Sequence, residues 1–372
     1  MNLRIVFRAD ASLEIGTGHV MRCLTLADAF KAQGAECYFI SRAFPGHSLE
    51  YINQRGFGVM ALPVRLPPSP NTIVTCDSAE EPVLVSSLGG DWQTDVQQSD
   101  AMLASLEPDW LVVDHYALDL RWEVALRPHY RKLLVIDDLA DRPHHCDLLL
   151  DQNLGRQPQD YASLVPTLCQ VLTGPKYALL RPEFAALRPY SLQRRKQPTL
   201  ERLLITMGGV DLPNATGQVL RVLKGCPLPH DCRISVVMGP QAPWLQSIQE
   251  LAAQMPWSTE VLVNINDIAQ RMADSDLAVG AAGSTSWERC CLGLPTLLVV
   301  LAANQWPGAR ALHEVQAARL IGGVSEIAAQ LPLAVRALTQ GLELMNMSNT
   351  ASALTNGQGA CKVLQALGAL ND

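Results

Sequence analysis

Short apolar runs alternate with amphipathic stretches in both halves of this 372-residue chain. In the first half these runs predict strands at 4–7, 36–40, 110–113, 132–136 and 147–150. The second half restarts the alternation, with strands predicted at 202–206, 233–238, 260–263, 277–279 and 296–301. Strands that alternate with helices build parallel sheets. We therefore predict two α/β domains, which also suits a chain longer than a single core usually allows.

A polar, basic segment that is bracketed by prolines separates the two series of strands. Such a composition is typical of a linker between domains. We predict an N-terminal domain at 1–187, the linker at 188–200, a C-terminal domain at 201–355 and a C-terminal helix at 356–372. Residues 67–99 are rich in Pro, Ser, Asp and Gly, with a strand-like run only at 82–85, which indicates a long loop.

Charge and composition restrict the partners of the chain. The net charge of −7 offers no broad basic surface for a nucleic-acid backbone, so we expect no nucleic-acid partner. No apolar stretch approaches the roughly 18 residues of a membrane span, so we expect no membrane insertion. The ten cysteines lack a Cys-x-x-Cys pair and follow no secretory signal, which favours reduced thiols and a cytoplasmic location.

The loop Gly16-Thr17-Gly18-His19 follows the first predicted strand and precedes a helical pattern at 20–33. A Gly-x-Gly turn at the end of a parallel strand lets the backbone approach a ligand closely. His19 at this place fits a general base near neutral pH, or a histidine that only hydrogen-bonds the loop. Arg8 and Asp10 leave the same strand, and for them a structural ion pair is as plausible as a contact with substrate.

The second half carries two glycine-rich strand exits. Gly280 to Glu288 combines small residues with a Ser/Thr cluster that opens a helix, and its free amides suit a diphosphate. Glu288 fits either a ribose ligand or an exposed carboxylate that favours the helix dipole. Gly208 and Gly209 follow the strand at 202–206, and we expect this loop to lie near the same phosphates.

Carboxylates follow two further strands of the first half. Asp114-His115-Tyr116 comes after 110–113, and Asp137-Asp138 comes after 132–136. A carboxylate at such an edge could orient a histidine or contact a sugar, while the alternative is a turn residue with a packed aromatic. We discount metal sites at 274–276, which precedes a strand, and at 144–147, where the ligands are adjacent. No metal and no cofactor are predicted.

Three motifs together carry a resemblance to one family: Ile15-Gly16-Thr17-Gly18-His19-Val20-Met21-Arg22-Cys23-Leu24, Asp114-His115-Tyr116 and Gly280-Ala281-Ala282-Gly283-Ser284-Thr285-Ser286-Trp287-Glu288-Arg289-Cys290. With these residues the sequence resembles the UDP-2,4-diacetamido-2,4,6-trideoxy-β-L-altropyranose hydrolases of pseudaminic acid biosynthesis. Shorter matches extend the resemblance over most of the chain, at 88–95, 143–147, 174–184, 207–209 and 304–305.

The resemblance implies a glycosyltransferase-B fold, with two Rossmann-like domains whose parallel sheets face each other across a cleft. It implies a metal-independent enzyme that acts on a UDP-sugar and water, with His19 as the catalytic base. The residues expected to contact the substrate are Arg8, Asp10, Gly18, Asp114, Tyr116, Gly208, Gly209, Gly283, Ser284, Thr285, Glu288, Asn304 and Gln305. Tyr116 and the segment 89–95 are the places where we expect the acetamido groups to be read.

The expected reaction is attack of His19-activated water on the anomeric carbon, with inversion and departure of UDP. The altrose configuration of the sugar depends on the resemblance alone. The competing hypotheses are a glycosyltransferase of the same fold and a nucleotide-sugar binding module without activity. Whether Asp10 or Asp114 orients His19 stays open at this point.

Overall fold

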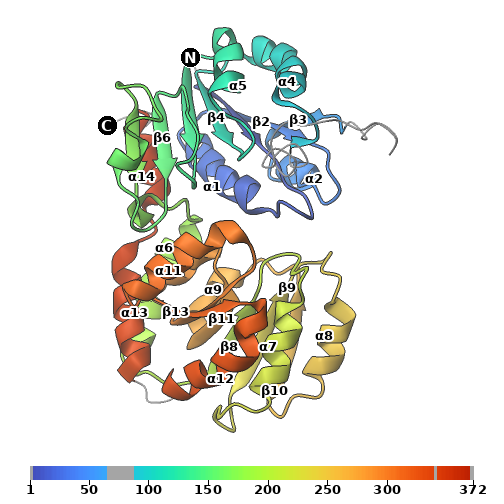
Figure 1. Cartoon of the computed structure of the whole chain (residues 1–372), viewed down its shortest axis with the longest axis vertical. Coiled ribbons are helices and arrows are strands. Elements are labelled where there is room, and N and C mark those ends of the chain that lie inside the picture. Colours follow the sequence, from blue (N-terminus) through green and yellow to red (C-terminus); the bar gives the residue numbers. More distant parts are fainter. Residues whose placement is uncertain (1–2, 65–87, 339–341, 369–372) are drawn as a thin grey trace. The chain divides into compact units, whose positions relative to one another are not determined.

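A computed structural model describes residues 3–64, 88–338 and 342–368 (Figure 1). The chain divides into two compact units, of which the first combines Met1–Leu179 with Ala360–Asp372 and the second is Leu180–Gly359. The predicted borders were 187 and 355. The last helix, α14 (Gly359–Ala366), therefore completes the first unit instead of standing apart. Its residues Val363 and Leu364 are buried in the apolar core of that unit.

The first unit contains a seven-stranded parallel sheet in the order β3-β2-β1-β4-β5-β6-β7. The strands are β1 (Arg4–Ala9), β2 (Glu36–Arg42), β3 (Gly58–Leu62), β4 (Trp110–Asp114), β5 (Lys132–Ile136), β6 (Leu148–Asp151) and β7 (Gln170–Thr173). The helices are α1 (Gly18–Ala32), α2 (Leu49–Gln54), α4 (Trp92–Leu106), α5 (Leu120–Ala125) and α14. The five strands predicted for this half are present, and β3 and β7 were not predicted.

Alternate residues of β1 enter the two cores that cover the two faces of this sheet. Phe7 belongs to the core that includes α1 and α14, whereas Val6 belongs to the core that includes Leu103 of α4 and Trp122 of α5. A parallel sheet that is covered on both faces needs nearly continuous apolar strands. This explains why β4 and β5 read as unbroken apolar runs in the sequence.

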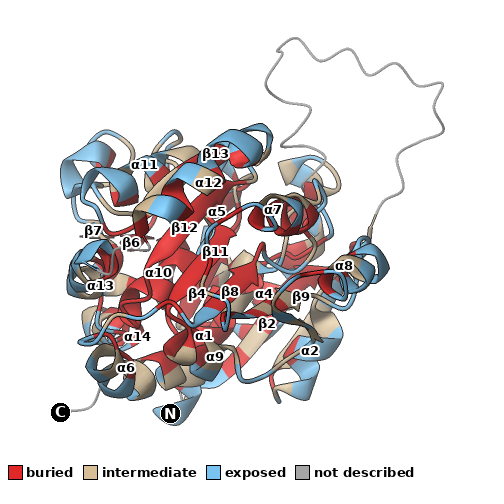
Figure 2. Cartoon of the chain, turned by 90° about the horizontal axis from the view of Figure 1, so that it is seen from below, coloured by how far each residue is buried: buried red, intermediate tan, exposed pale blue. Residues whose placement is uncertain are grey.

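The second unit contains a six-stranded parallel sheet in the order β10-β9-β8-β11-β12-β13. Its strands are β8 (Arg202–Thr206), β9 (Arg233–Met238), β10 (Ser258–Val263), β11 (Leu277–Ala281), β12 (Thr296–Val300) and β13 (Arg319–Gly323). Its helices are α6 (Pro182–Arg194), α7 (Ala215–Leu223), α8 (Leu245–Ala252), α9 (Ile268–Asp274), α10 (Thr285–Cys291), α11 (Trp306–Glu314), α12 (Ile327–Leu338) and α13 (Leu342–Leu354). Strands β11 and β12 are buried throughout (Figure 2).

The segment predicted as a linker, 188–200, is helical as far as Arg194, where α6 ends. Its arginines bind the carbonyl groups that helices leave unpaired at their C-termini. Arg188 donates to the carbonyls of Cys291, Ser352 and Thr355, and Arg195 donates to those of Met272, Ser275 and Leu292. The basic composition therefore reflects helix ends that these side chains satisfy, and not a solvated connection.

The long loop predicted at 67–99 is wrong for its last residues, which are helical from Trp92 onward. Residues 65–87, with the strand-like run at 82–85, lie outside the described residues. From Trp92 onward the chain is helix α4, which is capped by Asp91, whose carboxylate accepts a hydrogen bond from the Thr94 amide at 2.7 Å. In the described part of the chain, no helix combines the length and the apolarity that crossing a bilayer requires.

Candidate active site

The loop between β1 and α1 places His19 at the exit of the first sheet. Gly16 has a φ of +78°, a conformation that glycine adopts most readily, and its amide donates to the carbonyl of Ser12 at 2.9 Å. This closed turn leads directly into α1 at Gly18, so that His19 is the second residue of the helix. The His19 residue is 9% exposed, which leaves only a small part of it open to solvent.

Asp114, the last residue of β4, faces His19. Strand β4 pairs with β1 in a register that places Asp114 beside Ala9, so the two strand exits are neighbours. Oδ1 of Asp114 lies 2.6 Å from Nδ1 of His19. Nε and Nη2 of Arg22 each donate to the same carboxylate at 2.6 Å. Burial by itself would raise the pKa of Asp114, but Arg22 and His19 hold that pKa well below its ordinary value.

An ionised Asp114 determines how the imidazole of His19 carries its proton. A carboxylate only accepts hydrogen bonds, so Nδ1 of His19 must be the protonated nitrogen at their 2.6 Å contact. In the neutral ring Nε2 then carries a lone pair. Among the described residues the structure records no hydrogen-bond partner for Nε2 of His19. This arrangement allows Nε2 to accept a proton from a bound molecule.

Arg22 links the His19–Asp114 pair to two further side chains. Its Nη1 lies 2.8 Å from Oδ2 of Asp138, and the Tyr116 hydroxyl donates to the same oxygen at 3.2 Å. The ring of Tyr116 stands edge to face with the His19 ring, with 4.7 Å between their centroids. The structure thus brings together four candidate residues of the first half, which are His19, Asp114, Tyr116 and Asp138. Arg22 was not predicted as part of the site, although it follows His19 by three residues, on the same face of α1.

Arg8 and Asp10 form a structural ion pair, which was one of the two hypotheses for these residues. Both side chains are fully buried, and Nη1 of Arg8 lies 2.6 Å from Oδ1 of Asp10. Nη2 of Arg8 and Nη2 of Arg42 each lie 2.7 Å from Oδ2 of Asp95. Asp10 faces His115 at 3.3 Å and makes no recorded contact with His19. Asp114 is therefore the carboxylate that orients His19.

Asp95 is itself closed to a ligand, while the expectation that the segment 89–95 reads the sugar stays a prediction. Its side chain is fully buried, and it also accepts a hydrogen bond from the Trp122 indole at 2.9 Å. Gly89, at the start of this segment, has a φ of +70°, and a Cβ there would lie 2.9 Å from side-chain atoms of Arg42 and Phe44. Gly89 and Asp95 therefore pack against the buried charges of unit one, whereas Asp91 and Gln93 of the same segment are exposed.

The residues that follow β11 include three consecutive backbone donors that have no acceptor in the described part of the chain. Among the described residues, no hydrogen-bond acceptor is recorded for the N–H groups of Gly283, Ser284 and Thr285. Ser284 is exposed, and its side chain does not cap α10. Successive free N–H groups of this kind form a concave anion site in other proteins.

Glu288 is not the exposed carboxylate of the alternative reading. Its side chain is 17% exposed, and Oε1 lies 3.5 Å from Nη2 of Arg181. Burial raises the pKa of Glu288, while Arg181 opposes that rise. A partly buried carboxylate with a single long contact retains acceptor capacity for hydroxyl groups of a ligand.

The other residues predicted for the second half lie at neighbouring strand exits. Strand β8 pairs with β11, so the loop of Gly208 and Gly209 follows the strand beside the Gly280 segment. Gly208 has a φ of +86°. Gln305 accepts the Leu301 amide at 2.9 Å, and its Nε2 lies 3.8 Å from where a Cβ of Gly283 would be. Asn304 is exposed beside it, in a short helix at Ala303–Gln305.

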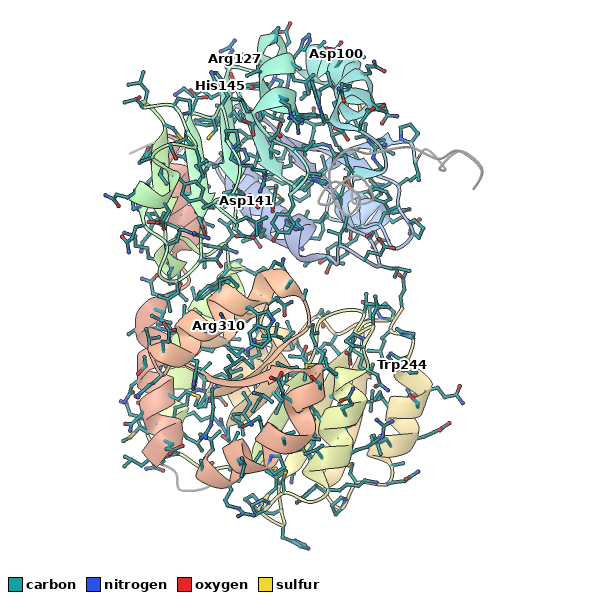
Figure 3. All side chains as sticks on the ribbon, viewed as in Figure 1. Asp100, Arg127, Asp141, His145, Trp244 and Arg310 are labelled. Atoms are coloured by element: carbon teal, nitrogen blue, oxygen red, sulfur yellow. The ribbon has the colours of Figure 1, made fainter. Side chains whose placement is uncertain are left out.

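Exposed aromatic surface lies at the exit of β9, the next strand of this sheet. Trp244, which precedes α8, is 38% exposed (Figure 3). Its indole N–H donates to the carbonyl of Leu212 at 2.9 Å, which ties the loop after β9 to the loop after β8. Gly239 packs against the same loop, since a Cβ there would lie 2.1 Å from the Gly209 carbonyl oxygen.

The two discounted metal motifs have structural roles. Asp276 accepts the amides of Glu201 and Arg202 and pairs with Arg194. Nδ1 of His144 lies 2.6 Å from Oε1 of the buried Glu123. Within 3–64, 88–338 and 342–368, no three His, Cys, Asp or Glu side chains are grouped so that they could hold a metal ion.

The fold defines the class of the protein. The prediction of two Rossmann-like units with parallel sheets is confirmed, and the structure has the fold of the glycosyltransferase-B type. MurG from Acinetobacter baumannii superimposes with a TM-score of 0.69 at 16% identity, over 99% of this chain and 100% of MurG. UGT89C1 from Arabidopsis thaliana gives a TM-score of 0.61 at 13% identity, over 99% of this chain and 98% of that structure.

Sequence comparison then gives more specific relatives. Over 82% of its length the chain is 25% identical to UDP-2,4-diacetamido-2,4,6-trideoxy-beta-L-altropyranose hydrolase from Campylobacter jejuni, of which it covers 93%. This similarity confirms the resemblance inferred from the motifs. An uncharacterized protein of Methanocaldococcus jannaschii is also 25% identical over 82% of the chain, which spans 56% of that protein.

A third relative covers less of the chain. The spore coat polysaccharide biosynthesis protein SpsG of Bacillus subtilis is 27% identical over 42% of the chain, which spans 45% of SpsG. No family model matches the chain.

Proposed function

We propose that this protein is an enzyme that hydrolyses a UDP-linked 2,4-diacetamido-2,4,6-trideoxy hexose at the anomeric carbon, for pseudaminic acid biosynthesis. The observation that carries the proposal is the His19–Asp114 pair, whose 2.6 Å contact at Nδ1 leaves Nε2 available as a base. The relative from Campylobacter, which is named as such a hydrolase and matched over 93% of its length, supports the substrate. The products are UDP and 2,4-diacetamido-2,4,6-trideoxy-L-altrose.

In the proposed reaction Nε2 of His19 takes a proton from water as the water oxygen attacks the anomeric carbon. The bond between that carbon and the diphosphate oxygen breaks, and UDP leaves with the electron pair. Attack from the face opposite the leaving group inverts the anomeric configuration. Asp114 stabilises the imidazolium that forms, because its pKa is held low and it stays ionised. Arg22 and Tyr116 keep this pair in place through Asp138.

The second unit is proposed to bind UDP. The free N–H groups of Gly283, Ser284 and Thr285 would receive the diphosphate, and they would stabilise the charge that develops on UDP as it leaves. Glu288 would accept hydrogen bonds from the ribose hydroxyls. The loop of Gly208 and Gly209, with Asn304 and Gln305, would line the phosphates or the sugar. No metal ion is required in this scheme.

A glycosyltransferase reaction is the second candidate, because solved structures that share the fold include glycosyltransferases such as the spinosyn rhamnosyltransferase, at a TM-score of 0.61 and 15% identity. In that case the hydroxyl of an acceptor replaces water, and the same base could serve. The two reactions differ in whether UDP is released without an acceptor.

One experiment separates the candidates. The purified protein is incubated with the UDP-sugar in oxygen-18 water. The released sugar is reduced at once, which prevents exchange of its anomeric oxygen with water, and the masses of both products are measured by mass spectrometry. One label on the sugar and none on UDP is the expected result. Label in a phosphate would contradict attack at carbon. Turnover only after an acceptor is added would favour the transferase. Binding of the UDP-sugar without any turnover would favour a binding module without activity.

A further inference from the structure

Arg289 of α10 is a buried cation that contacts no carboxylate of the described residues. The residue is 1% exposed, and no Asp or Glu oxygen lies within 4 Å of its guanidinium in the part of the chain that the structure describes. Nη2 donates to the carbonyl of Ala281 at 2.7 Å and to the hydroxyl of Ser286 at 3.1 Å, and Nη1 donates to the hydroxyl of Thr285 at 3.2 Å. Nε has no acceptor at all among these residues.

Two other fully buried arginines of the described residues are compensated by acids, whereas the buried Arg195 meets only backbone carbonyls. Arg8 pairs with Asp10 and Asp95, and Arg42 pairs with Asp95. The acid next to Arg289 in the sequence, Glu288, contacts Arg181 and acts on Arg289 only from beyond 4 Å. A guanidinium stays charged when it is buried, so its charge must be balanced by something else. Even though burial lowers the pKa of Arg289 to about 10, the group is cationic at neutral pH.

The position of Arg289 indicates what balances it. Its three hydrogen bonds hold both ends of the segment Ala281–Ser286, within which the N–H groups of Gly283, Ser284 and Thr285 have no recorded acceptor. A Cβ on Gly280 would lie 2.6 Å from Nη1 of Arg289. The charge therefore lies directly beneath the exit of β11, on the inner side of the proposed phosphate site.

We propose that Arg289 is a positioning residue whose counter-ion is the diphosphate of the bound nucleotide. It does not touch the ligand. It fixes the segment that presents the free N–H groups, and its charge, which no carboxylate of the described residues contacts, makes that segment selective for an anion. The inference rests on the proposed function, because it assumes that this segment binds the diphosphate of UDP. It adds that affinity for the phosphates, and not for the nucleoside, depends on a side chain beneath the site.

The test measures the affinities of UDP and of uridine by calorimetry, for the wild type, Arg289→Met and Arg289→Lys. We expect Arg289→Met to weaken UDP at least about tenfold and to leave uridine unchanged. Arg289→Lys keeps the charge and should restore part of the UDP affinity. Arg221→Met, which removes an exposed charge from α7 of the same unit, is the matched control and should leave both affinities unchanged.

Equal losses for UDP and uridine in Arg289→Met would overturn the inference, because they would indicate a merely structural role. Unchanged UDP affinity would overturn it as well. Gly280→Ala serves if Arg289→Met does not fold: its methyl group would meet Nη1 at 2.6 Å and displace the guanidinium, with the same selective loss of UDP affinity expected. A wild type that does not bind UDP would instead refute the proposed UDP site itself.

Discussion

Nδ1 of His19 and Oδ1 of Asp114 lie 2.6 Å apart although 95 residues separate them in the chain. The parallel pairing of β1 with β4 is what joins them, because it brings the ends of the two strands side by side. The contact gives His19 a fixed ring orientation and a defined proton on Nδ1. It also distinguishes the two carboxylates that sequence alone left equivalent, since Asp10 belongs to a separate buried cluster.

Replacement of the proposed base is the most direct test of the site. We expect His19→Asn to lower kcat at least about 100-fold, which is the usual effect of losing a general base. UDP release from the UDP-sugar measures it. The affinity for UDP should stay at the wild-type value, because UDP is proposed to bind to the second unit. Turnover close to that of the wild type would remove His19 from the mechanism.

Asp114→Asn tests the carboxylate behind the base through stability and pH. The substitution leaves the buried Arg22 short of a counter-ion, so we expect the free energy of unfolding to fall by about 3–5 kcal/mol at pH 7. The pKa of Asp114 is lowered in the folded state. Its contribution is therefore complete above the unfolded pKa of about 3.9 and is lost as the pH falls toward the folded value.

Chemical denaturation of the wild type and of Asp114→Asn at pH 7 and pH 3 measures this effect. The difference in unfolding free energy between them should be smaller at pH 3. A difference that stays constant over this range would mean that the Asp114 carboxylate is not stabilised by Arg22 and His19 in the folded state.

Local patterns were sufficient to predict ten of the thirteen described strands, and the three that were missed, β3, β7 and β13, each lie at the edge of a sheet. They also placed His19 and Asp114 at strand exits, because an apolar run that ends in a polar residue marks the edge of a parallel sheet. Local patterns do not predict the order of the strands in the sheet. The periodicity around 110–114 does not indicate that β4 lies next to β1, and the contact of Asp114 with His19 depends on that neighbour relation.

The features that sequence analysis missed depend on long-range contacts. Arg22 joins Asp114 to Asp138 across three elements of the chain, and a local pattern registers it only as a polar residue of an amphipathic helix. Arg188 and Arg195 looked like linker residues because their acceptors, the carbonyls at helix ends, lie 77 to 167 residues away. Asp95 looked like part of a polar loop because the buried Arg8 and Arg42 that need it lie far away in sequence, on β1 and β2.

Asp95→Asn separates this structural cluster from the catalytic one. The change leaves Arg8 and Arg42 without the carboxylate they share, so we expect unfolding to become easier by about 3–5 kcal/mol. The KM of the folded fraction should stay within about twofold, because these side chains are buried. Denaturant unfolding and initial rates on the same preparation measure the two effects.

The matched control is Asp119→Asn, in the same unit. Asp119 pairs with Arg121, whose side chain is 59% exposed, and asparagine can keep its role at the start of α5. We expect that variant to change the free energy of unfolding by less than about 1 kcal/mol. A raised KM for Asp95→Asn with unchanged stability would instead place this cluster in contact with substrate.

Glu288→Gln tests the nucleotide end of the site. A carboxylate can accept hydrogen bonds from both ribose hydroxyls, whereas an amide has one oxygen and two N–H donors. Loss of a hydrogen bond to a charged group should weaken UDP about tenfold or more. The loss should be smaller for 2′-deoxy-UDP, so that discrimination between the two nucleotides shrinks. Arg181 keeps Glu183 as a partner at 3.1 Å, so the variant does not leave the Arg181 charge unpaired.

The pH dependence of UDP affinity provides an independent check of the same residue. Burial raises the pKa of Glu288, so the wild-type carboxylate takes up a proton at a higher pH than an exposed glutamate does. A protonated Glu288 resembles glutamine in having lost its charge. We therefore expect wild-type affinity for UDP to fall toward that of Glu288→Gln as the solution is acidified, while the variant changes less over the same range. Parallel pH profiles for the two proteins would show that Glu288 does not bind the ribose.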